Sequence, residues 1–490
     1  MTAGGGLARR YHDRTAHSPA SVRSSAHTLE WDIKPFPFKV YVDAPALELP
    51  RDLEPLTVPA LAAVAARAAP RPRAMALTGL ATLLYAAAGV TKKKTYAGGG
   101  EVLFRAAAST GALYQTEVYV AAGAIEGLAP GLYHFCPGDF TLRRLRDGDW
   151  RGWLARAAAD ETLGRRAAVL VLTAIYWRNT WKYQARGFRH LFWDSGTMLA
   201  NALAAGVGLG LAPRVVTGFV DGDVNGLLGL DAEREGAVEL LAVGPETPPA
   251  PARASMEPIR HDVMPLSERE VDYPLLREMY RASALPAPDA VAAWRSGMPP
   301  ALPPVRGPLT PLELGAALWA SAQPIAWDVP SGLVERFLVV NAVAGVAPGA
   351  YRYVAARHAL ELLKPGDFRR ESAYLCLEQP LGGEAAAVIY FLAPLDGLIG
   401  AFGDRGYRLA NLEAGLAGGR AYLAAYALGF GASGLTFYDR LVTEFFAPGA
   451  SGLDAIFVTA LGRAAGGASD MLLSKTIEPN MRPAREDASG

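Results

Sequence analysis

Cysteine is almost absent from the chain: only Cys136 and Cys376 occur among 490 residues. Two cysteines so far apart in the sequence cannot form a disulfide framework. No Cys-x-x-Cys pair is present to hold a metal or to carry out thiol redox chemistry. Both are expected to be small buried apolar side chains. The seven histidines are scattered along the chain, so we expect no metal site.

An excess of charge of either sign is also missing. Lys and Arg together number 48, and Asp and Glu also number 48, so no overall field attracts nucleic acid or anionic lipid. A nucleic-acid-binding protein normally carries a basic excess or a basic stripe. The composition therefore predicts that nucleic acid is not a partner.

Long apolar runs are missing as well. The longest, Ala167–Trp177 and Ala385–Leu395, are far shorter than the roughly 20 residues that a membrane-spanning helix needs, and we expect buried strands there. Residues 1–18 contain arginines but no apolar core of the kind that a secretory signal carries. The sequence predicts a cytoplasmic protein that does not associate with membranes.

What the sequence does contain is an internal repeat. Val169-Leu-Val-Leu-Thr-Ala174 aligns with Val388-Ile-Tyr-Phe-Leu-Ala393 at an offset of 219, and Arg186-Gly-Phe-Arg189 aligns with Arg405-Gly-Tyr-Arg408 at the same offset. Further matches within one residue of that offset are Gly127-x-x-Pro-Gly-x-Tyr133 with Gly345-x-x-Pro-Gly-x-Tyr351, Gly196 with Gly415, Gly210 with Gly429, and Phe219-x-Asp221 with Phe437-x-Asp439. So many matches in the same order are not chance, so the chain contains two related units.

Each unit is predicted to contain the same elements. In chain order these are a helix (77–88; 310–322), a strand (116–122; 335–340), a strand after the Gly-x-x-Pro-Gly turn, a short charged strand (141–145; 359–363), the long apolar strand, and a helix (186–207; 405–428). Helices mixed with antiparallel-looking strands indicate an α+β fold.

The predicted organisation has five parts. These are an N-terminal arm (1–60), a first unit (61–245), a linker with a helix (246–300), a second unit (301–463) and a tail (464–490). The arm is expected to pack on the first unit. The linker is bounded by the proline-rich stretches Pro245–Ala250 and Pro299–Pro308, with one helix predicted over Leu266–Met279.

The first difference between the units is one of length. Glu117 follows Tyr85 by 32 positions, whereas Glu335 follows Trp319 by 16. The additional residues include Lys92–Gly100 and part of Arg105–Tyr114. A loop with an arginine, two hydroxyl groups and free backbone amides suits a phosphate and a polar ring edge. An ordinary surface loop would fit the same residues.

The second difference concerns two side chains. Lys182-Tyr183 precedes the arginine motif in the first unit, where the second unit has Ala401-Phe402. The fold therefore does not require a cation and a phenol at this junction. A neighbouring positive charge favours the phenolate form of tyrosine, so the pair is a candidate general acid/base. The alternative is a snorkelling lysine beside a half-buried tyrosine.

Several motifs together resemble one family. They are Arg105-x-x-x-Ser109-x-Gly111-Ala-Leu-Tyr114, Lys182-Tyr183-x-x-Arg186-Gly-Phe-Arg189, Asp221-x-x-x-Asn225, Tyr11-His12-x-x-Thr15 and Pro37-Phe-Lys39-x-Tyr41. The pattern resembles tandem flavoproteins of the nitroreductase superfamily, and among these the streptolysin-S-type (thiazole/oxazole) azoline dehydrogenases. The resemblance covers nearly the whole chain.

The resemblance implies a mixed sheet flanked by helices and an FMN bound at an interface, which a tandem chain forms internally as a pseudo-dimer. It implies that Lys182 and Tyr183 are catalytic. Tyr183 would take a proton while a hydride passes to flavin N5, and Lys182 would lower the pKa of the phenol. The implied cofactor-binding residues are Arg105, Ser109, Thr110, Gly111, Arg186, Gly208, Gly210 and Leu211.

The chain also departs from the family pattern. The Arg-Arg-Ser-x-Arg run that often binds the FMN phosphate is reduced to Arg295-Ser296, which leaves Arg105 and one of Lys92–Lys94 as candidates. No winged-helix domain for peptide recognition is evident at the N-terminus. Small-molecule and modified-peptide substrates, biosynthetic partner proteins and a further oligomer all remain open.

Two alternatives to a dehydrogenase are retained. One is an NAD(P)H-dependent reductase of nitro compounds or quinones, and the other is a non-catalytic flavoprotein-like scaffold in a biosynthetic complex. Gly206-x-Gly208-x-Gly210 follows a predicted helix, which is the wrong context for a dinucleotide-binding fingerprint. We therefore interpret these glycines as a helix end.

Overall fold

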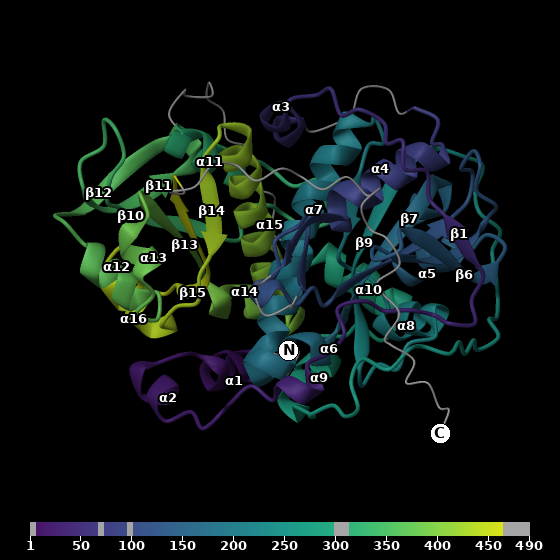
Figure 1. Ribbon diagram of the computed structural model, residues 1–490, viewed down its shortest axis with the longest axis horizontal. Helices are drawn as coiled ribbons and strands as arrows, with labels where there is room; N and C mark the ends of the chain where they lie inside the picture. The colour runs from purple at the N-terminus through teal and green to yellow at the C-terminus, as the bar shows by residue number, and fades with distance from the viewer. Residues whose placement is uncertain (1–5, 67–72, 96–100, 298–312, 464–490) are drawn as a thin grey trace.

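The computed structural model describes residues 6–66, 73–95, 101–297 and 313–463. Two α+β units stand side by side, each built around one large sheet (Figure 1). The predicted α+β fold with two tandem units is confirmed. The predicted tail, 464–490, lies outside the described residues.

The two large sheets have the same strand order. The first unit has β1 (Ala46–Glu48), β6 (Thr141–Asp147), β5 (Gly131–Cys136), β4 (Thr116–Ala122), β7 (Arg166–Ile175), β9 (Glu235–Glu246) and β8 (Arg214–Val216), in that spatial order. The second has β12 (Ala359–Pro365), β11 (Gly349–Val354), β10 (Glu335–Val340), β13 (Ala387–Ala393), β15 (Asp454–Gly462) and β14 (Gly431–Gly434). Apart from the edge strand β1, the orders correspond strand for strand, and neighbouring strands are antiparallel.

The helices also occur in equivalent pairs. The pairs are α4 (Leu77–Ala88) with α11 (Glu313–Ser321), α5 (Arg151–Ala157) with α12 (Arg369–Leu375), α6 (Tyr176–Tyr183) with α14 (Leu395–Phe402), α7 (Gly187–Gly208) with α15 (Arg405–Ala427), and α8 (Asp221–Leu228) with α16 (Asp439–Phe445). The short helix α13 (Pro380–Glu384) precedes β13. Even a turn contact repeats, since Tyr133 Oη donates to Ala129 O and Tyr351 Oη donates to Ala347 O.

Helices α7 and α15 pack against each other between the two sheets (Figure 1). Their backbones touch at glycines that are equivalent in the repeat. A Cβ on Gly196 would lie 2.6 Å from Leu416 N, and one on Gly415 would lie 2.4 Å from Trp193 O. Only glycine allows so close an approach of two backbones. The match of Gly196 with Gly415 therefore marks a seam with approximate two-fold symmetry.

The repeated Arg-Gly-aromatic-Arg motif forms buried ion pairs across this seam. Each pair of arginines reaches the aspartate of the other unit, which makes the contact reciprocal. Arg186 Nη1 and Arg189 Nη1 lie 3.0 and 2.5 Å from Asp439 oxygens, and Arg405 Nη1 and Arg408 Nη1 lie 2.8 and 2.7 Å from Asp221 oxygens. The motif is thus part of the contact between the units.

The N-terminal arm contacts both units, whereas the sequence suggested the first unit only. Helix α1 (Gly6–Thr15) contacts the second unit, where Ala8 N donates to Asp404 and Arg9 pairs with Asp454 at 2.8 Å. It also contacts the first unit, since Arg189 Nη2 donates to His12 O at 2.7 Å. After α2 (Pro19–Arg23), the chain continues along the first unit, where β1 pairs with β6. Helix α3 (Ala60–Ala65) follows. The arm therefore ties the two units together.

The linker contains two helices where one was expected over Leu266–Met279. They are α9 (Pro274–Ala282) and α10 (Pro288–Ser296). Each begins at a proline, whose fixed φ suits the first helical position and whose missing N–H is not needed there. Pro288 therefore starts a new helix after the first has ended.

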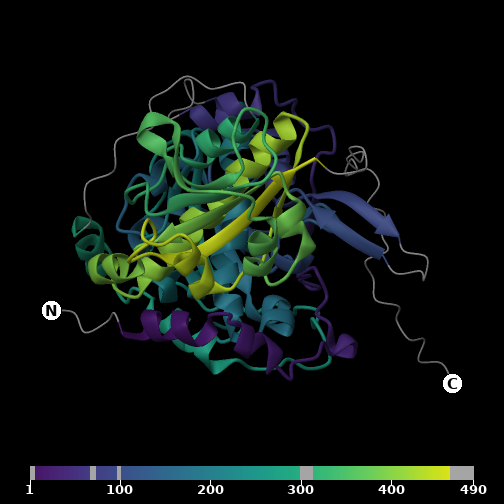
Figure 2. The ribbon, with the colours of Figure 1, turned by 90° about the vertical axis from the view of Figure 1, so that its left-hand side faces the viewer.

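The additional stretch of the first unit contains a β-hairpin that sequence reasoning treated as a loop. Strands β2 (Val90–Thr95) and β3 (Glu101–Arg105) pair with each other and project from the body (Figure 2). Near the body, Val90 and Leu103 pack with Phe38. The hairpin ends at Arg105. The Ser109–Tyr114 segment follows it and leads into β4 of the first sheet.

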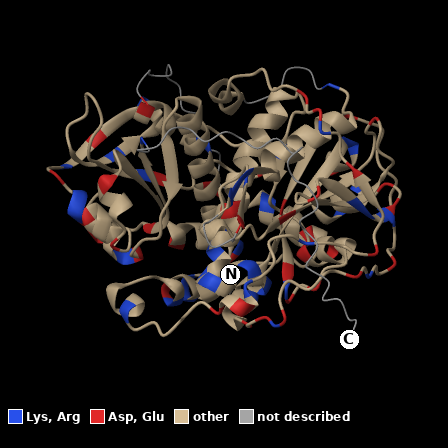
Figure 3. Ribbon diagram, viewed as in Figure 1, with Lys and Arg blue, Asp and Glu red and all other residues tan. Residues whose placement is uncertain are grey.

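Charges of both signs are interspersed over the two units (Figure 3). In the part of the chain that the structure describes, no helix combines the length and the apolar composition needed to cross a bilayer. Within the same residues, no three His, Cys, Asp or Glu side chains cluster as metal ligands would.

Candidate active site

The two features that distinguish the first unit lie in contact. Gly111 adopts a φ of +64°, and a Cβ built on it would lie 2.8 Å from Tyr183 Oη and 3.4 Å from Lys182 Cδ. The segment from Ser109 to Tyr114, called the site loop below, therefore meets the end of α6. Residues that are far apart in sequence, and that the second unit replaces with other residue types or a shorter loop, lie together in one candidate site.

Helix α6 is anchored by its apolar face. Trp177 and Trp181 are buried with Ile33 and Leu113 in one apolar cluster. The indole of Trp181 also donates to Glu30 O at 2.8 Å. Because this face is held, the last turn presents Lys182 and Tyr183 toward the site loop.

Tyr183 is half-buried, and burial together with the nearby charge of Asp194 raises its pKa. Lys182 is exposed, and its Nζ lies 5.3 Å from the centroid of the Tyr183 ring. The ammonium is thus placed over the ring face, in contact with solvent. The pKa of Tyr183 in the ligand-free protein is therefore raised overall, where a pKa lowered by Lys182 was expected.

The hydroxyl groups of the site loop are bound by a carboxylate that sequence reasoning missed. Ser109 Oγ and Thr110 Oγ1 donate to Asp194 of α7 at 2.5 and 2.6 Å, and Thr110 N donates to it at 2.8 Å. Gln115 Nε2 donates to the same carboxylate. The hydroxyls of Ser109 and Thr110 therefore face the protein, which corrects the expectation that they bind a phosphate or a ring edge directly.

Arg105 connects the site loop to the N-terminal arm. Its guanidinium lies 5.1 Å from the ring centroids of both Phe38 and Tyr114, and its Nη2 donates to Pro37 O at 2.6 Å. Its Nε is buried without a hydrogen-bond partner in the described residues. Because the guanidinium lies between two aromatic rings, it has little freedom to move in order to bind a phosphate.

Arg186, Arg295 and Lys93 are engaged elsewhere. Arg186 belongs to the seam, where it also donates to Thr15 O at 2.6 Å. This corrects its expected place in the cofactor site. Arg295 pairs with Asp328 at 3.1 Å, and Lys93 pairs with Glu101 of the hairpin at 2.5 Å.

Gly208, Gly210 and Leu211 lie far from Lys182 and Tyr183. Arg166, the first residue of β7, donates to Leu211 O at 3.0 Å, whereas α6 follows the last residue of that strand. Ten residues of strand span about 30 Å. These backbone groups and Tyr183 therefore lie at opposite ends of β7 and cannot serve one flavin, which corrects the expected site.

The glycine-rich end of α7 instead borders a seam cavity of about 500 Å³. The cavity lies between Ala212–Arg214 of the first unit and Pro324–Ala326 of the second, and Val215 N donates to Ala326 O across this contact. The segment after α7 in the first unit thus meets residues 324–326 of the second unit. These residues precede Gly332 and Leu333, which take the place of the site loop in that unit.

The repeat identifies which helix end lies beside the site loop. Gly429 and Phe430 follow Gly210 and Leu211 by 219 positions, so the end of α15 is the helix end expected beside the site loop. Tyr426, in the last turn of α15, is 62% exposed, and it adds to the effect of burial, the main cause, in raising the pKa of Tyr114. The site therefore draws on both units, and sequence reasoning paired the loop with the wrong helix end.

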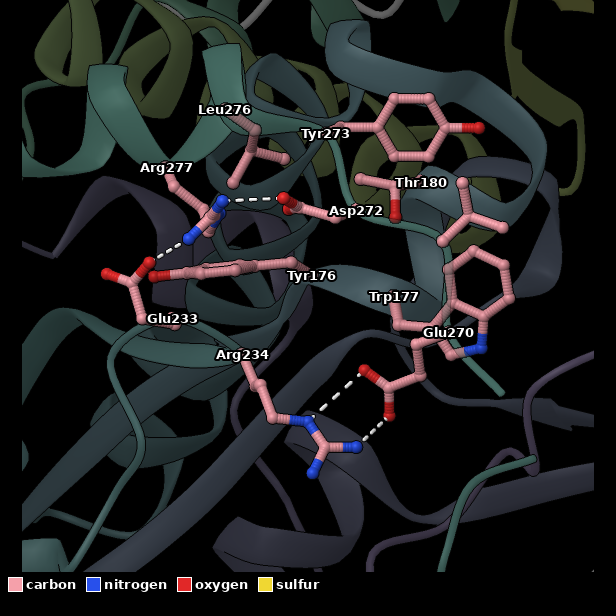
Figure 4. A pocket seen from close by; sticks show the side chains of 11 residues that line it. Tyr176, Trp177, Thr180, Glu233, Arg234, Glu270, Asp272, Tyr273, Leu276 and Arg277 are labelled. Carbon is pink, nitrogen blue, oxygen red and sulfur yellow. Dashed lines mark hydrogen bonds and ion pairs between the residues drawn. The ribbon is translucent and has the colours of Figure 1, made fainter. Parts of the chain in front are cut away.

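A cavity of about 220 Å³ lies on another side of α6 (Figure 4). Tyr176, Trp177 and Tyr273 line it together with five charged residues. These charges are paired with one another, since Arg234 pairs with Glu270, and Arg277 pairs with both Glu233 and Asp272. Because no charged group there is left to bind a ligand, we do not assign this cavity to the active site.

Replacing Gly111 with alanine should damage the site locally. The Cβ would press on Tyr183 Oη, and alanine at a φ of +64° is strained. Strain of this kind costs about 1–3 kcal/mol. We expect lower thermal stability and a displaced Tyr183, measured by melting temperature and by tyrosine titration. Gly452→Ala is the control for strain alone, because its φ is +77° and no neighbour lies within 4 Å of its Cβ. Equal effects of the two variants would contradict the contact with Tyr183.

Comparison by sequence identifies a relative about as long as one unit. A protein of Methanocaldococcus jannaschii that carries the provisional name of a nitroreductase is 29% identical over 171 residues, which are 35% of this chain and 81% of that protein. No protein-family model matches the chain.

Comparison by structure extends the likeness to both units. The crystal structure of a provisionally named nitroreductase from Anabaena variabilis matches with a TM-score of 0.73 and 28% identity, and the match covers 93% of this chain and 99% of that one. A chain of the Escherichia coli microcin synthetase McbBCD complex with truncated pro-MccB17 matches with a TM-score of 0.32 and 20% identity, over 49% of this chain and 92% of that one. A TM-score that low carries no functional argument.

Proposed function

Because the chain is a homologue of nitroreductases in sequence and in fold, we propose that it is an FMN-dependent oxidoreductase whose active site lies where the site loop meets Lys182 and Tyr183. The observation that carries the proposal is the contact of Gly111 with Tyr183 Oη. It joins the longer loop of the first unit to the Lys-Tyr pair, where the second unit has a shortened loop and Ala401-Phe402.

The groups around the site loop fit a flavin. Gly111, Ala112 and Tyr114 all have positive φ, and Ala112 N and Tyr114 N donate to Ser109 O and Ser109 Oγ within the loop. Of these three amides, that of Gly111 is the one not used within the loop, and such an amide suits a polar ring edge. Exposed Tyr426 on α15 supplies an aromatic face from the second unit. Bound FMN would accept or donate a hydride there, which the protein's own side chains cannot do.

The chain's own residues would handle the proton. In a dehydrogenase, Tyr183 takes a proton from the substrate, which requires its phenolate. Because the pKa of Tyr183 is raised in the ligand-free protein, the rate of such a reaction would rise with pH well above neutrality. Lys182, placed over the ring, would stabilise the negative charge as it forms.

The raised pKa of Tyr183 specifically favours a second candidate, an NAD(P)H-dependent reductase. There Tyr183 donates its proton to the reduced substrate, and its protonated form is the active one. The rate would then fall as the pH rises through the pKa of Tyr183. The pH dependence of turnover distinguishes the two directions. For the substrate, we propose a small molecule or a modified peptide, the latter in association with biosynthetic partner proteins.

The purified protein is expected to bind about one FMN per chain. One site loop and one Lys-Tyr pair exist, so a flavin bound at each unit is not expected. Absorbance spectra and quantitation of the flavin released on denaturation measure both identity and stoichiometry. A protein that stays colourless after addition of excess FMN would refute the proposal, and two flavins per chain would refute its asymmetry. Rapid bleaching of the bound flavin by NADH under anaerobic conditions would favour the reductase.

A further inference from the structure

We propose that Asp194 is a positioning residue of this active site: its carboxylate sets the conformation of the site loop, whose Gly111 contacts the hydroxyl that moves the proton. This inference deepens the proposed function and rests on it. Asp194 is not part of the motifs by which the sequence resembles the family, and it contacts the proposed flavin-binding groups only through the loop.

The first argument is the number of contacts. Asp194 accepts hydrogen bonds from Ser109 Oγ, Thr110 Oγ1, Thr110 N and Gln115 Nε2, all within 2.8 Å. Ser109 Oγ in turn accepts from Tyr114 N at 2.9 Å. Both ends of the site loop are thus tied to one buried carboxylate. Gly111, Ala112 and Tyr114 of the loop have positive φ angles, and non-glycine residues keep such angles only where the surrounding structure imposes them.

The second argument comes from the other unit. Asp194 corresponds to Glu413 at the repeat offset of 219. Glu413 accepts from Gly332 N at 2.9 Å and from Leu333 N at 3.0 Å, and these residues form the shortened counterpart of the site loop. A carboxylate at the same position of the central helix therefore holds the equivalent segment in both units, although the held segments share little sequence. This carboxylate contact is therefore common to both units, and only in the first unit does the held segment contact a Lys-Tyr pair.

The third argument links the loop to the proton. Besides burial, the charge of Asp194 raises the pKa of Tyr183. The other titratable groups that face this phenol are Lys182 on its own helix and His190 on α7, whose ring centroid lies 4.5 Å away. Burial raises the pKa of Asp194 itself to about 6, with its hydrogen bonds acting in the opposite direction. Asp194 thus carries its charge at neutral pH, where it disfavours the phenolate.

Two substitutions separate the contacts from the charge. Asp194→Asn can retain most of the hydrogen bonds, because the Thr110 hydroxyl can rotate to accept one, but it removes the charge. Asp194→Ala removes both. We expect Asp194→Ala to weaken FMN binding at least tenfold, measured by quenching of flavin fluorescence. We expect Asp194→Asn to bind FMN within about threefold of the wild type and to shift the Tyr183-dependent limb of the pH–rate profile about 1 unit lower. A purely structural aspartate would not move that limb.

The matched control is Glu413→Gln in the second unit, which should leave FMN affinity and the pH profile unchanged. Hydrogen exchange of the Thr110 amide in the flavin-free protein tests the loop independently of the cofactor, and it should accelerate at least tenfold in Asp194→Ala. Wild-type affinity together with wild-type exchange in Asp194→Ala would overturn the inference. If the wild-type protein binds no FMN, the proposed function fails, and faster exchange would then identify Asp194 as a structural residue only.

Discussion

Tyr183→Phe should lower kcat by about 10²- to 10⁴-fold, the contribution that a positioned proton-transfer group usually makes. FMN affinity should change little, because the ring, which contacts Lys182 and His190, is retained. The hydroxyl is the group lost, and it is the only part of the residue that can exchange a proton with a substrate. Steady-state kinetics with the best available nitro, quinone or azoline substrate, together with FMN titration, measure the two effects separately.

The second unit supplies the controls for this experiment. Phe402 occupies the position equivalent to Tyr183 and is buried at the end of α14, so phenylalanine is compatible with this junction of the fold. The reverse substitution, Phe402→Tyr, should leave kcat unchanged. Lys182→Ala, which copies Ala401, should lower kcat less than Tyr183→Phe does. Full activity of Tyr183→Phe would remove Tyr183 from the mechanism while leaving the flavin site intact.

Asp439→Asn should destabilise the protein by about 3–5 kcal/mol, the usual cost of breaking a buried ion pair from one side. Its carboxylate accepts from Arg186, Arg189 and the backbone N–H of His17, and both arginines are almost completely buried. An amide in its place leaves two guanidinium groups without a counter-charge. Chemical denaturation followed by tryptophan fluorescence measures the loss of free energy of unfolding.

Two other substitutions test whether the seam is reciprocal. Asp221→Asn removes the equivalent partner of Arg405 and Arg408 and should cost a similar amount. Glu444→Gln breaks an exposed pair with Arg440 and should cost less than about 1 kcal/mol. A small effect of Asp439→Asn, comparable to that of Glu444→Gln, would contradict the assigned role of the seam ion pairs.

The same cluster gives a pH dependence with a definite sign. Although burial acts to raise it, the charges of Arg186 and Arg189 hold the pKa of Asp439 well below its ordinary value. A carboxyl group with a lowered pKa in the folded state stabilises the fold fully above its unfolded pKa of about 4. That stability is lost as the pH falls from about 4 toward the folded pKa. The difference in stability between wild type and Asp439→Asn should therefore shrink below about pH 4.

Much of the fold could be predicted because the repeat provided two observations of each element that the two units share. Strands β4 and β10 and helix α4 have the predicted bounds, since their hydrophobic pattern is uninterrupted. The hairpin β2–β3 could not be predicted in this way, because it has no counterpart in the second unit and three consecutive lysines obscure its alternation.

The site was predicted in part. Lys182, Tyr183 and Gly111 were identified by their absence from the second unit, and the structure brings them together. Asp194 was missed because Glu413 matches it in charge but not in identity, although an acidic residue at the repeat offset was a usable signal. Gly208, Gly210 and Leu211 were grouped with the wrong loop. The two units repeat the same helix end, and the sequence does not show which of the two lies beside the site loop.

The glycine contact between α7 and α15 has a consequence for how the halves could diverge. In an assembly of two identical chains, a substitution at such a contact would occur on both faces at once, and its steric effect would be felt twice. In a fused chain, Gly196 and Gly415 are separate positions, and the covalent connection keeps the halves together at any dilution. Each half is then free to change alone. The second half can then carry Ala401-Phe402 where the first has Lys182-Tyr183, and it still packs permanently against the first half.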